Sequence, residues 1–349
     1  MILIQNIYYM LSYAFTILKK QDYADCATEE FDHTADLLAA ILTKGIDIQI
    51  KRGLDHEYIS HTATLNTIRG KIDISDTVKE QIRSRQQAVC TFDEFSLNSY
   101  TNQILKTTLM LLLRSPDVAH KRKKLIKRQL MYFQDVSLLT PNKISWNIRL
   151  SRNVATYEML LNICYLVCEG LLQTERDGKI RLMRFVDEQR LFALYEKFVL
   201  EYYKKEYPLL HTKASLIRWD TDDDMTELLP TMRTDITITD GIRTLVIDTK
   251  YYSSNLVKYL DKESIRSSHL YQIYAYVKNL DSKNSGLVSG LLLYAKTTDD
   301  TQPNNTYSIS GNTISVKTLD LNQDFNAIRQ DLDEIVIATF GIENSALLS

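Results

Sequence analysis

Glycine and proline are scarce in this chain of 349 residues, which contains 10 glycines and 5 prolines. Both residues interrupt regular structure, so their scarcity favours long helices and argues against a loop-rich fold. Long apolar runs are also missing: the nearest candidate, residues 159–172, is broken by Asn162 and Glu169. The sequence therefore predicts no transmembrane helix, and the N-terminus lacks the basic and small residues of a signal peptide.

Cysteine is limited to four residues, and their spacings match neither a disulfide framework nor a CxxC metal site. Cys164 and Cys168 lie on an apolar helical stretch and are expected to be buried as small hydrophobic side chains. There is no excess of one charge either, because the net charge is -2. These features fit a reducing cytoplasm, and a local basic patch would still allow nucleic-acid binding.

The first half of the chain, residues 1–150, is expected to be a mixed domain of helices and short antiparallel strands. Apolar residues spaced three or four apart predict helices, whereas strict alternation predicts strands. The predicted helices cover residues 5–19, 31–44, 75–89, 96–114 and 118–134, and the predicted strands cover residues 45–51, 57–65 and 70–75.

The second half, residues 151–349, is expected to be an α/β (α+β) domain. Its predicted elements are helices at 153–173, 187–206, 267–280 and 322–339, strands at 215–219 and 286–296, and hairpins at 234–252 and 306–321. The core order is therefore α-β-β-β-α-β, with a crossover helix between two buried strands.

The hairpin around Asp240-Gly241, a favoured two-residue turn, carries charged residues on a buried strand. Side chains of one strand alternate between faces, so Val246, Asp248 and Lys250 share a face. A two-residue turn places Asp235 opposite Val246, and therefore diagonally beside Asp248 on the same face. A three-residue loop would instead move Asp235 to the other face.

Two carboxylates and an ammonium group at the end of a buried strand suit phosphodiester hydrolysis. Mg²⁺ takes oxygen ligands and often only one or two carboxylates, and it lowers the pKa of bound water. A lysine can orient or deprotonate that water. The alternative is an ordinary ion pair at a sheet edge. The D-x-K pattern also occurs at residues 177–179 and 281–283, in polar sequence where exposure to solvent is expected.

At these residues the sequence resembles the PD-(D/E)xK nuclease superfamily, whose core has the order α-β-β-β-α-β. The resemblance makes Asp235 the first acid, Asp248 the second acid and Lys250 the catalytic lysine. It also implies that Asp235 and Asp248 bind the metal, with the Thr249 carbonyl as a third ligand. Thr234 stands where the superfamily usually has proline.

Three further residues come from the same resemblance. Gln272 and Tyr276, four residues apart on the helix after the third strand, would position the lysine or contact phosphate. The alternative for both is packing of the helix on the sheet. Glu196 lies on the helix that opens the core and would support the metal site, although a solvated helix face is an equal alternative for Glu196 and for Glu201.

A closer resemblance, over nearly the whole chain, is to the McrC family, the nuclease subunits of McrBC-type modification-dependent restriction systems. The matching stretches are "NIYYMLSYAF", "IRGKID", "TFDEFSLNSYTNQILK", "LYEKFVLEYY" and "LLPTMRTDITI" followed by "LVIDTKYY". The resemblance implies a Mg²⁺-dependent DNA endonuclease, with Mn²⁺ able to substitute.

The same resemblance implies that residues 1–150 dock on a hexameric McrB-like AAA+ GTPase and stimulate it, and that the substrate is double-stranded DNA carrying 5-methylcytosine. The chain has no GxxxxGK[ST] phosphate loop, so no nucleotide is expected to bind the chain itself. Two alternatives stay open, namely a non-catalytic activator of an AAA+ GTPase and a stand-alone PD-(D/E)xK nuclease.

Two basic stretches have no assigned role. Residues 120–129, "HKRKKLIKRQ", contain six Lys or Arg and no acid, which indicates either phosphate contact or a solvated helix face. The "RGK" sequence at 69–71 is either a contact with DNA or a partner, or a connection between strands.

Overall fold

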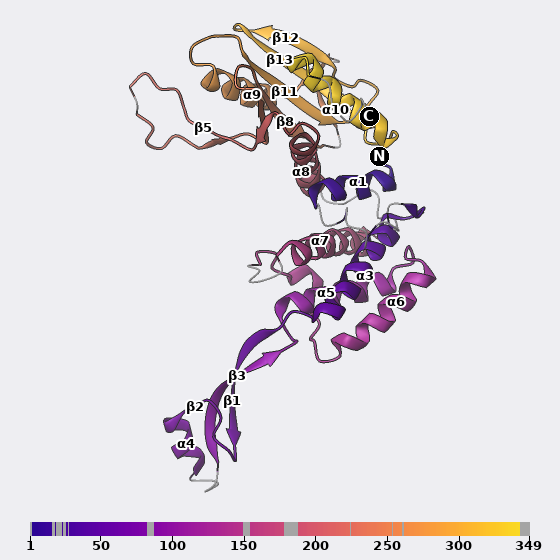
Figure 1. Ribbon diagram of the computed structural model, residues 1–349, viewed down its shortest axis with the longest axis vertical. Helices are drawn as coiled ribbons and strands as arrows, with labels where there is room; N and C mark the ends of the chain where they lie inside the picture. Colours follow the sequence, from indigo (N-terminus) through magenta and orange to yellow (C-terminus); the bar gives the residue numbers. More distant parts are fainter. Residues whose placement is uncertain are drawn as a thin grey trace. The chain divides into compact units, whose positions relative to one another are not determined.

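The computed structural model describes residues 2–15, 18, 23, 26, 28–81, 87–148, 154–177, 188–223, 225–252, 254–259 and 262–342. They form two compact units (Figure 1). The first unit, called the sheet unit here, combines residues 1–32 with residues 181–349, and the second, called the helical unit, consists of residues 33–180.

This division differs from the boundary predicted near residue 150. Helix α7 (Val154–Asp177) packs against α3 (Thr34–Arg52) and α5 (Tyr100–Arg114), and it therefore belongs to the helical unit. Helix α1 (Ile4–Ala14) packs instead against α8 (Glu188–Glu206). The Asn6 side chain ties α1 to the C-terminal part of the chain, because it donates to the Leu321 carbonyl at 2.9 Å. Apolar packing and this hydrogen bond join the two ends of the sequence.

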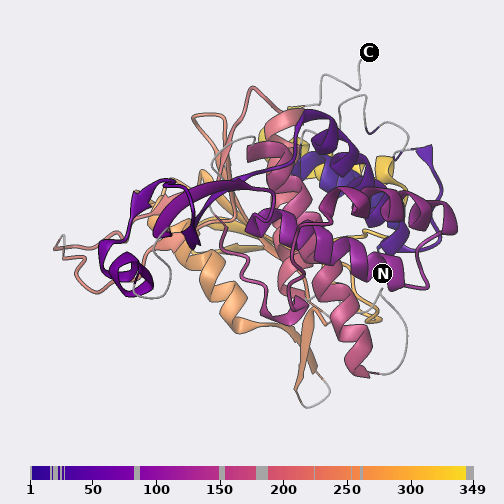
Figure 2. The ribbon, with the colours of Figure 1, turned by 90° about the horizontal axis from the view of Figure 1, so that it is seen from below.

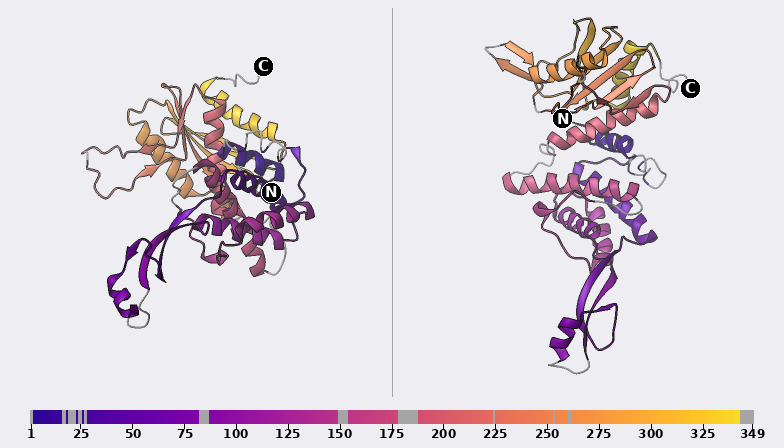
Figure 3. Two further views of the ribbon diagram at one scale, coloured as in Figure 1. Left: turned by 60° about the horizontal axis from the view of Figure 1, so that its bottom comes forward. Right: turned by 90° about the vertical axis from the view of Figure 1, so that its left-hand side faces the viewer.

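The helical unit contains a three-stranded antiparallel sheet in the order β1-β3-β2. The strands are β1 (Glu57–Leu65), β2 (Lys71–Ile72) and β3 (Ala88–Ser96), and the remaining elements are α4 (Ile74–Gln81), α6 (His120–Leu130), η3 (Met131–Phe133) and η4 (Pro141–Lys143). This sheet and α4 extend away from the helices as a slender arm, defined here as residues 54–81 and 87–98 (Figures 1 and 3).

The strand predicted at residues 45–51 is wrong, because these residues form the end of α3. Leu42, Ile46 and Gln49 are buried and continue the stripe that begins at Leu38. Their spacing is that of one helix face. Burial of this face outweighed the alternation of isoleucines that indicated a strand.

The arm contains a strand that the sequence did not predict. The helix predicted at 75–89 is confined to α4, and β3 follows it as the central strand. Gly70, in the "RGK" stretch, has φ +68°, and a Cβ at this position would clash with the carbonyl oxygen of Thr91. The Arg69 guanidinium lies 4.2 Å from the Phe92 ring centre. These contacts show that "RGK" makes a close connection between strands.

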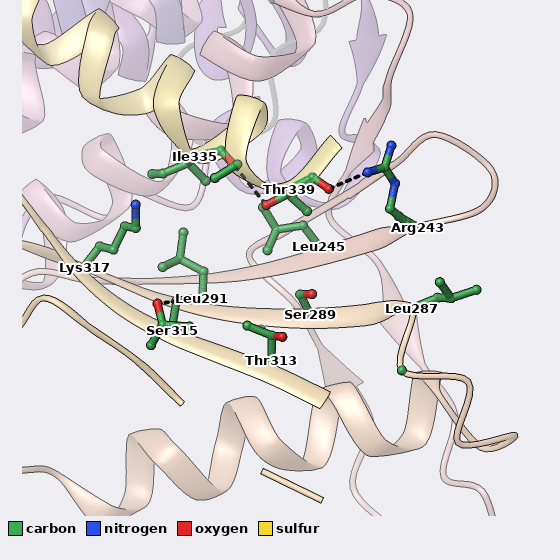
Figure 4. A pocket seen from close by; sticks show the side chains of 14 residues that line it. Arg243, Leu245, Leu287, Ser289, Leu291, Thr313, Ser315, Lys317, Ile335 and Thr339 are labelled. Atoms are coloured by element: carbon green, nitrogen blue, oxygen red, sulfur yellow. Dashed lines mark hydrogen bonds between the residues drawn. The ribbon is translucent and has the colours of Figure 1, made fainter. Parts of the chain in front are cut away.

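The sheet unit is built on a six-stranded mixed sheet in the order β12-β13-β11-β8-β7-β4. Strands β8, β11 and β13 are parallel, and the other pairs are antiparallel. The strands are β4 (His211–Lys213), β7 (Ile236–Thr239), β8 (Thr244–Lys250), β11 (Val288–Ala295), β12 (Asn305–Ile309) and β13 (Asn312–Leu319). Helices α9 (Ser267–Leu280) and α10 (Phe325–Phe340) lie on opposite faces of this sheet (Figure 4).

The order α8-β4-β7-β8-α9-β11 reproduces the predicted α-β-β-β-α-β core, with two corrections. The first core strand is β4, whereas the predicted strand at 215–219 contributes β5 (Leu216–Ile217) to a separate pair with β6 (Met232–Arg233). A hairpin of β9 (Leu256–Tyr259) and β10 (Lys262–Ile265) lies between β8 and α9, and the sequence did not predict it (Figure 2).

Tight packing holds β8 and β11 beneath α9. Val246 is buried in one cluster with Ile273 and Val277 of the helix. A Cβ at Gly290 would come within 2.8 Å of Ile273 and 2.9 Å of Val277, so glycine lets α9 approach β11 closely. The backbone around the end of β8 is thereby fixed in position.

Two further expectations can be compared with the structure. All four cysteines are buried and free of disulfides, as predicted for Cys164 and Cys168. Within the described ranges, no helix has the length and apolar character needed to cross a membrane.

Candidate active site

The pairing of β7 with β8 brings the two predicted acids together. The loop contains four residues, 240–243, and Ile236 opposes Ile247. This register differs by two positions from the predicted one. An even shift preserves the faces of the sheet, so Asp235 and Asp248 still share a face. Asp235 directly precedes the paired residues of β7, and its charge contributes to raising the pKa of Asp248, so the two carboxylates lie near each other.

The loop itself explains the register. Asp240 Oδ1 accepts hydrogen bonds from the N–H groups of Ile242 at 2.9 Å and Arg243 at 2.6 Å. Gly241, which lies between Asp240 and Ile242, has φ +92°. The Arg243 guanidinium also donates to the carbonyls of Thr339 and Phe340 at the end of α10. The turn therefore spans four residues and is anchored to the helix behind the sheet.

Asp235, the first predicted acid, is held by Thr249. Its Oδ2 accepts the Thr249 backbone N–H at 2.7 Å and the Thr249 hydroxyl at 2.8 Å. Burial raises the pKa of Asp235, and these two hydrogen bonds oppose that change. The N–H and C=O of a strand residue point to the same side, so the Thr249 carbonyl lies on the Asp235 side of β8. The predicted third metal ligand is thus beside the first acid.

Asp248, the second predicted acid, is almost completely buried, with 1% of its surface exposed. Lys250 Nζ lies 2.5 Å from Asp248 Oδ2, and the lysine side chain is 8% exposed. Asp248 Oδ1 has no hydrogen-bond donor in the part of the chain that the structure describes. Burial, and then the charge of Asp235, raise the pKa of Asp248 to about 6. A buried carboxylate oxygen without a donor is costly, and a cation would satisfy it.

Lys250, the predicted lysine, begins a chain of hydrogen bonds that crosses to β6. Its Nζ donates to Gln272 Oε1 at 3.1 Å, and Gln272 Nε2 donates to the Tyr276 hydroxyl at 2.8 Å. The Tyr276 hydroxyl donates in turn to the Arg233 carbonyl at 2.9 Å. Gln272 therefore contacts both the lysine and Tyr276, whereas packing alone would not require this chain.

Glu196 and Glu201 of α8 differ in their surroundings. Burial raises the pKa of Glu196 to about 7, and the charges of Asp235 and Asp248 contribute to this rise. Glu201 pairs with Lys204 at 2.7 Å on a partly exposed face of the helix. The structure thus brings Glu196, and not Glu201, into the electrostatic field of the two aspartates.

Sequence reasoning missed His269, which is buried behind Lys250. Its Nδ1 lies 2.7 Å from the Tyr294 hydroxyl, and its ring stacks on Tyr252 with 5.2 Å between centres. Burial, and then the charge of Lys250, lower the pKa of His269 to about 4. The spacing offered a signal, because His269 lies three residues before Gln272 on the same helix face.

Thr234 explains the departure from the superfamily pattern. Its backbone N–H donates to the Ser215 carbonyl at 2.9 Å, a hydrogen bond that proline cannot make. Its hydroxyl lies 2.9 Å from the Thr237 hydroxyl. Threonine here ties the entry of β7 to the segment before β5.

The other D-x-K sequences have different positions. Asp281, expected to be exposed, is in fact buried and accepts hydrogen bonds from Ser285, Gly286 and Asn312 in the connection between α9 and β11. Its role is to order that turn. Residues 178 and 179 of the remaining sequence lie outside the described residues.

A cavity of about 310 Å³ lies on the other face of the sheet, beside α10 (Figure 4). Leu245, Leu291, Ser315 and Lys317 are among the residues that line it. None of the candidate catalytic residues does. The candidate site is consequently at the ends of β7 and β8, apart from this cavity.

The ligand set suits a hard divalent ion. Among the described residues, no group of three His, Cys, Asp or Glu side chains is arranged to bind a metal ion. Two carboxylates and one carbonyl nevertheless suffice for Mg²⁺, which retains several waters and often binds only one or two carboxylates. The unpartnered Asp248 Oδ1 agrees with this chemistry.

The core order and the nearby acids Asp235 and Asp248 describe an α/β protein whose core is consistent with the PD-(D/E)xK type. The chain belongs to the family described as McrBC 5-methylcytosine restriction system component, whose model matches residues 4–295. The resemblance seen in the sequence is therefore confirmed.

Two relatives illustrate this membership. The type IV methyl-directed restriction enzyme EcoKMcrBC of Escherichia coli (strain K12) is 29% identical over 338 residues, which cover 95% of this chain and 96% of that protein. A chain in the half-complex from the tetradecameric assembly of Thermococcus gammatolerans McrB AAA+ hexamers with bound McrC has a TM-score of 0.52 and 16% identity. The match covers 95% of this chain and 76% of that one, and it supports the fold.

The hydrogen bonds to Asp235 generate a first prediction. Thr249→Val removes the hydroxyl donor but keeps the backbone N–H and the preference for a strand. We expect Mn²⁺ affinity to fall at least about 10-fold, because a hydrogen bond to a charged group contributes about 1.5–3 kcal/mol. Isothermal titration calorimetry measures the affinity of both proteins for Mn²⁺. Thr249→Ser is the control and should bind as the parent does, whereas equal affinity in the valine variant would show that the hydroxyl does not position Asp235.

The raised pKa of Glu196 generates a second prediction, for the metal-free protein. A carboxyl whose folded pKa of about 7 exceeds its unfolded value stabilises the fold in full below the unfolded pKa. This contribution is lost as the pH rises from about 4.3 through the folded pKa. Glu196→Gln should therefore gain stability relative to the parent above pH 7, by up to about 1 kcal/mol given its partial exposure.

Urea denaturation at a series of pH values measures this difference. Glu201→Gln, on the same helix, is the control for removing one acidic side chain from α8. A difference between Glu196→Gln and the parent that does not change with pH would contradict the interpretation of Glu196.

Proposed function

We propose that this chain is the Mg²⁺-dependent DNA endonuclease subunit of a 5-methylcytosine-dependent restriction system. The observation that carries the proposal is the buried Asp248 carboxylate, which lies near Asp235 and beside Lys250 and has an oxygen that no donor among the described residues reaches. Family membership supports the restriction system as the setting.

Asp235, Asp248 and the Thr249 carbonyl are the groups that would hold Mg²⁺, with Mn²⁺ as a substitute. When bound, the ion stabilises charge that develops on the phosphate and lowers the pKa of coordinated water. Asp235 is presented to the ion by its two hydrogen bonds to Thr249, which leave Oδ1 available. Asp248 contributes the oxygen that lacks a donor among the described residues.

Lys250 orients the attacking water or transfers its proton, and its charge faces the phosphate. The ammonium is held between Asp248 and Gln272, and Tyr276 fixes Gln272 from the next turn of α9. Glu196 supports the site as a third carboxylate. Its ionisation is favoured when a cation offsets the charges of the two aspartates.

The relatives suggest the setting of this chemistry. One of them is named a methyl-directed restriction enzyme, and a structural neighbour comes from a complex of McrB AAA+ hexamers with bound McrC. We propose that this chain likewise docks on an McrB-like AAA+ GTPase hexamer, stimulates its GTP hydrolysis and cleaves double-stranded, methylated DNA. The chain itself binds no nucleotide, and the GTPase supplies that function.

The arm of the helical unit offers a surface for this partner. Tyr58 and Phe95 are cross-strand neighbours with ring centres 5.1 Å apart, and 72% and 59% of their surfaces are exposed. Ile74 and Val78 of α4 are exposed as well. Aromatic and apolar side chains gathered on a projecting element are typical of protein interfaces. The earlier expectation that residues 1–150 bind the partner thus becomes a proposal about the arm.

Asp248→Asn tests the nuclease. Plasmid cleavage is measured with this chain, the partner GTPase, GTP and Mg²⁺, on methylated and unmethylated DNA. Cleavage of methylated plasmid should fall at least about 100-fold, because even an outer partner of a metal ligand is worth 10- to 100-fold. Stimulation of GTP hydrolysis should persist, since Asp248 lies inside the sheet unit.

Glu201→Gln is the control and should cleave normally. Undiminished cleavage by Asp248→Asn would refute the assigned site. Stimulated GTP hydrolysis without any cleavage by the parent chain would favour a non-catalytic activator. Cleavage by the chain alone would identify a stand-alone nuclease.

The arm generates a separate prediction. The double substitution of Tyr58→Ser with Phe95→Ser should weaken binding to the GTPase at least about 10-fold, since exposed aromatic residues are frequent anchors of interfaces. Mn²⁺ binding should be unchanged. Surface plasmon resonance on the immobilised partner measures the loss. As the control, Leu209→Ser removes an apolar residue of the sheet unit that is even more exposed, at 87%. Equal loss in both variants would show that the arm is not the contact.

A further inference from the structure

Helix α6 carries a surface for which the proposed function gives no role. The helix contains six Lys or Arg and no Asp or Glu. Its buried side is formed by Ile126 and Gln129. Lys123, Lys124 and Lys127 lie within about 100° of one another around the helix axis, and we call them the lysine face.

The helix is anchored firmly enough to hold this face in one orientation. Gln129 Nε2 donates to the Thr43 carbonyl at 2.7 Å and to Asp47 Oδ1 at 2.8 Å, both in α3. At the other end, the Ala119 N–H donates to Asp36 Oδ1 at 2.9 Å. Polar contacts from α3 thus fix both ends of α6 and leave the lysine face directed away from the buried side.

The charges of the lysine face are not neutralised by the described part of the protein. Within that part, no ion pair or hydrogen bond is made by the ammonium groups of Lys123, Lys124 and Lys127. Asp47, the acid beside α6, already accepts from Gln129 and pairs with Arg128 at 3.4 Å.

This arrangement weakens the helix. Lys123 and Lys127, like Lys124 and Arg128, are four residues apart, and such like-charge pairs each destabilise a helix. The first turn contains no acid of its own, and the acid at this end of the helix, Asp36, belongs to α3. A surface designed only for solubility would alternate charges of both signs. Unpaired positive charges that oppose folding point to an external anion.

We propose that the lysine face binds the phosphate backbone of DNA, independently of base sequence and methylation. The inference deepens the proposed function and rests on it, because it assigns part of substrate binding to the helical unit. DNA is favoured over a protein partner because lysine is depleted at protein interfaces, whereas the face contains lysines and no apolar side chain. Lys123 and Lys127 are about 6 Å apart along the axis, and DNA carries one charge per about 1.7 Å of its length.

The test uses the full chain with the three residues of the lysine face changed to glutamine (Lys123→Gln, Lys124→Gln and Lys127→Gln). Fluorescence anisotropy measures binding to a labelled duplex without divalent ions, between about 50 and 200 mM salt. We expect affinity at low salt to fall at least about 10-fold. The slope of log affinity against log salt should become shallower by roughly 2 to 3, the value for three lost phosphate contacts.

Two comparisons sharpen this test. The matching triple change to arginine keeps the charges and should bind DNA as the parent does. Methylated and unmethylated duplexes should lose affinity equally. The urea midpoint of the glutamine variant should not fall, because removing like charges does not weaken the helix, and this excludes misfolding as the cause.

Each other outcome overturns the proposal. An unchanged salt slope with lost stimulation of the partner GTPase would make the lysine face a protein contact. An unchanged slope with normal stimulation would make it a solvated helix face. These results are separate from the nuclease assignment, which Asp248→Asn tests by cleavage. The lysine face can bind DNA even if the nuclease assignment fails. Equally, the nuclease assignment can hold even if the lysine face does not bind DNA.

Discussion

Antiparallel pairing between β7 and β8 determines which side chains can meet at the candidate site. A shift of one residue would move Asp235 to the face of Leu245, where α10 packs, and would leave Asp248 alone beside Lys250. The four-residue loop that Asp240 organises prevents such a shift, and Arg243 anchors it to α10. The chemistry of the strand ends thus depends on a turn at the far end of the hairpin.

The site concentrates charge where burial makes charge costly. Asp248 and Lys250 form a buried ion pair, and such a pair adds little to stability although losing one member costs about 3–5 kcal/mol. Burial and mutual repulsion raise the pKa of Glu196 and of Asp248, and His269 is kept neutral beside the lysine. The two positive charges of Lys250 and Arg233 do not balance three carboxylates, and this imbalance is a physical reason to expect a cation.

Much of the site could be predicted from the sequence because its residues follow simple periodicities. Alternation along one strand put Asp248 and Lys250 on a common face, and helical spacing put Gln272 beside Tyr276. The pairing of β7 with β8 could be predicted only to within two residues. An Asp-Gly pair fits both a two-residue and a four-residue loop, and the two loops give registers that differ by an even number of residues. Local sequence patterns could not predict two contacts between different elements. These are the hydrogen bonds from Thr249 to Asp235 and the stacking of His269 on Tyr252.

The fold shows the same limits. Most of the α-β-β-β-α-β order was predictable because β7, β8 and β11 carry apolar residues and are bounded by turns, whereas the first strand, β4, is a polar stretch of three residues that the sequence did not reveal. The strand β3 was missed because "AVCTFDEFS" alternates poorly, with two buried residues side by side and three exposed residues in a row. Residues 45–51 alternate well but complete the buried face of α3. Helix α1 belongs to the sheet unit because it packs on α8, far away in the sequence. The composition of the chain could not reveal this division into units.

The most direct test of the central claim is thermal melting with and without Mn²⁺, for the parent chain and for Asp235→Ala and Asp248→Ala. A ligand that binds only the native state raises the melting temperature. The account predicts that Mn²⁺ raises it in the parent and in neither variant, because the facing carboxylates hold the ion together. An equal rise in all three proteins would show that the ion binds elsewhere, and the paired aspartates would then not be a metal site.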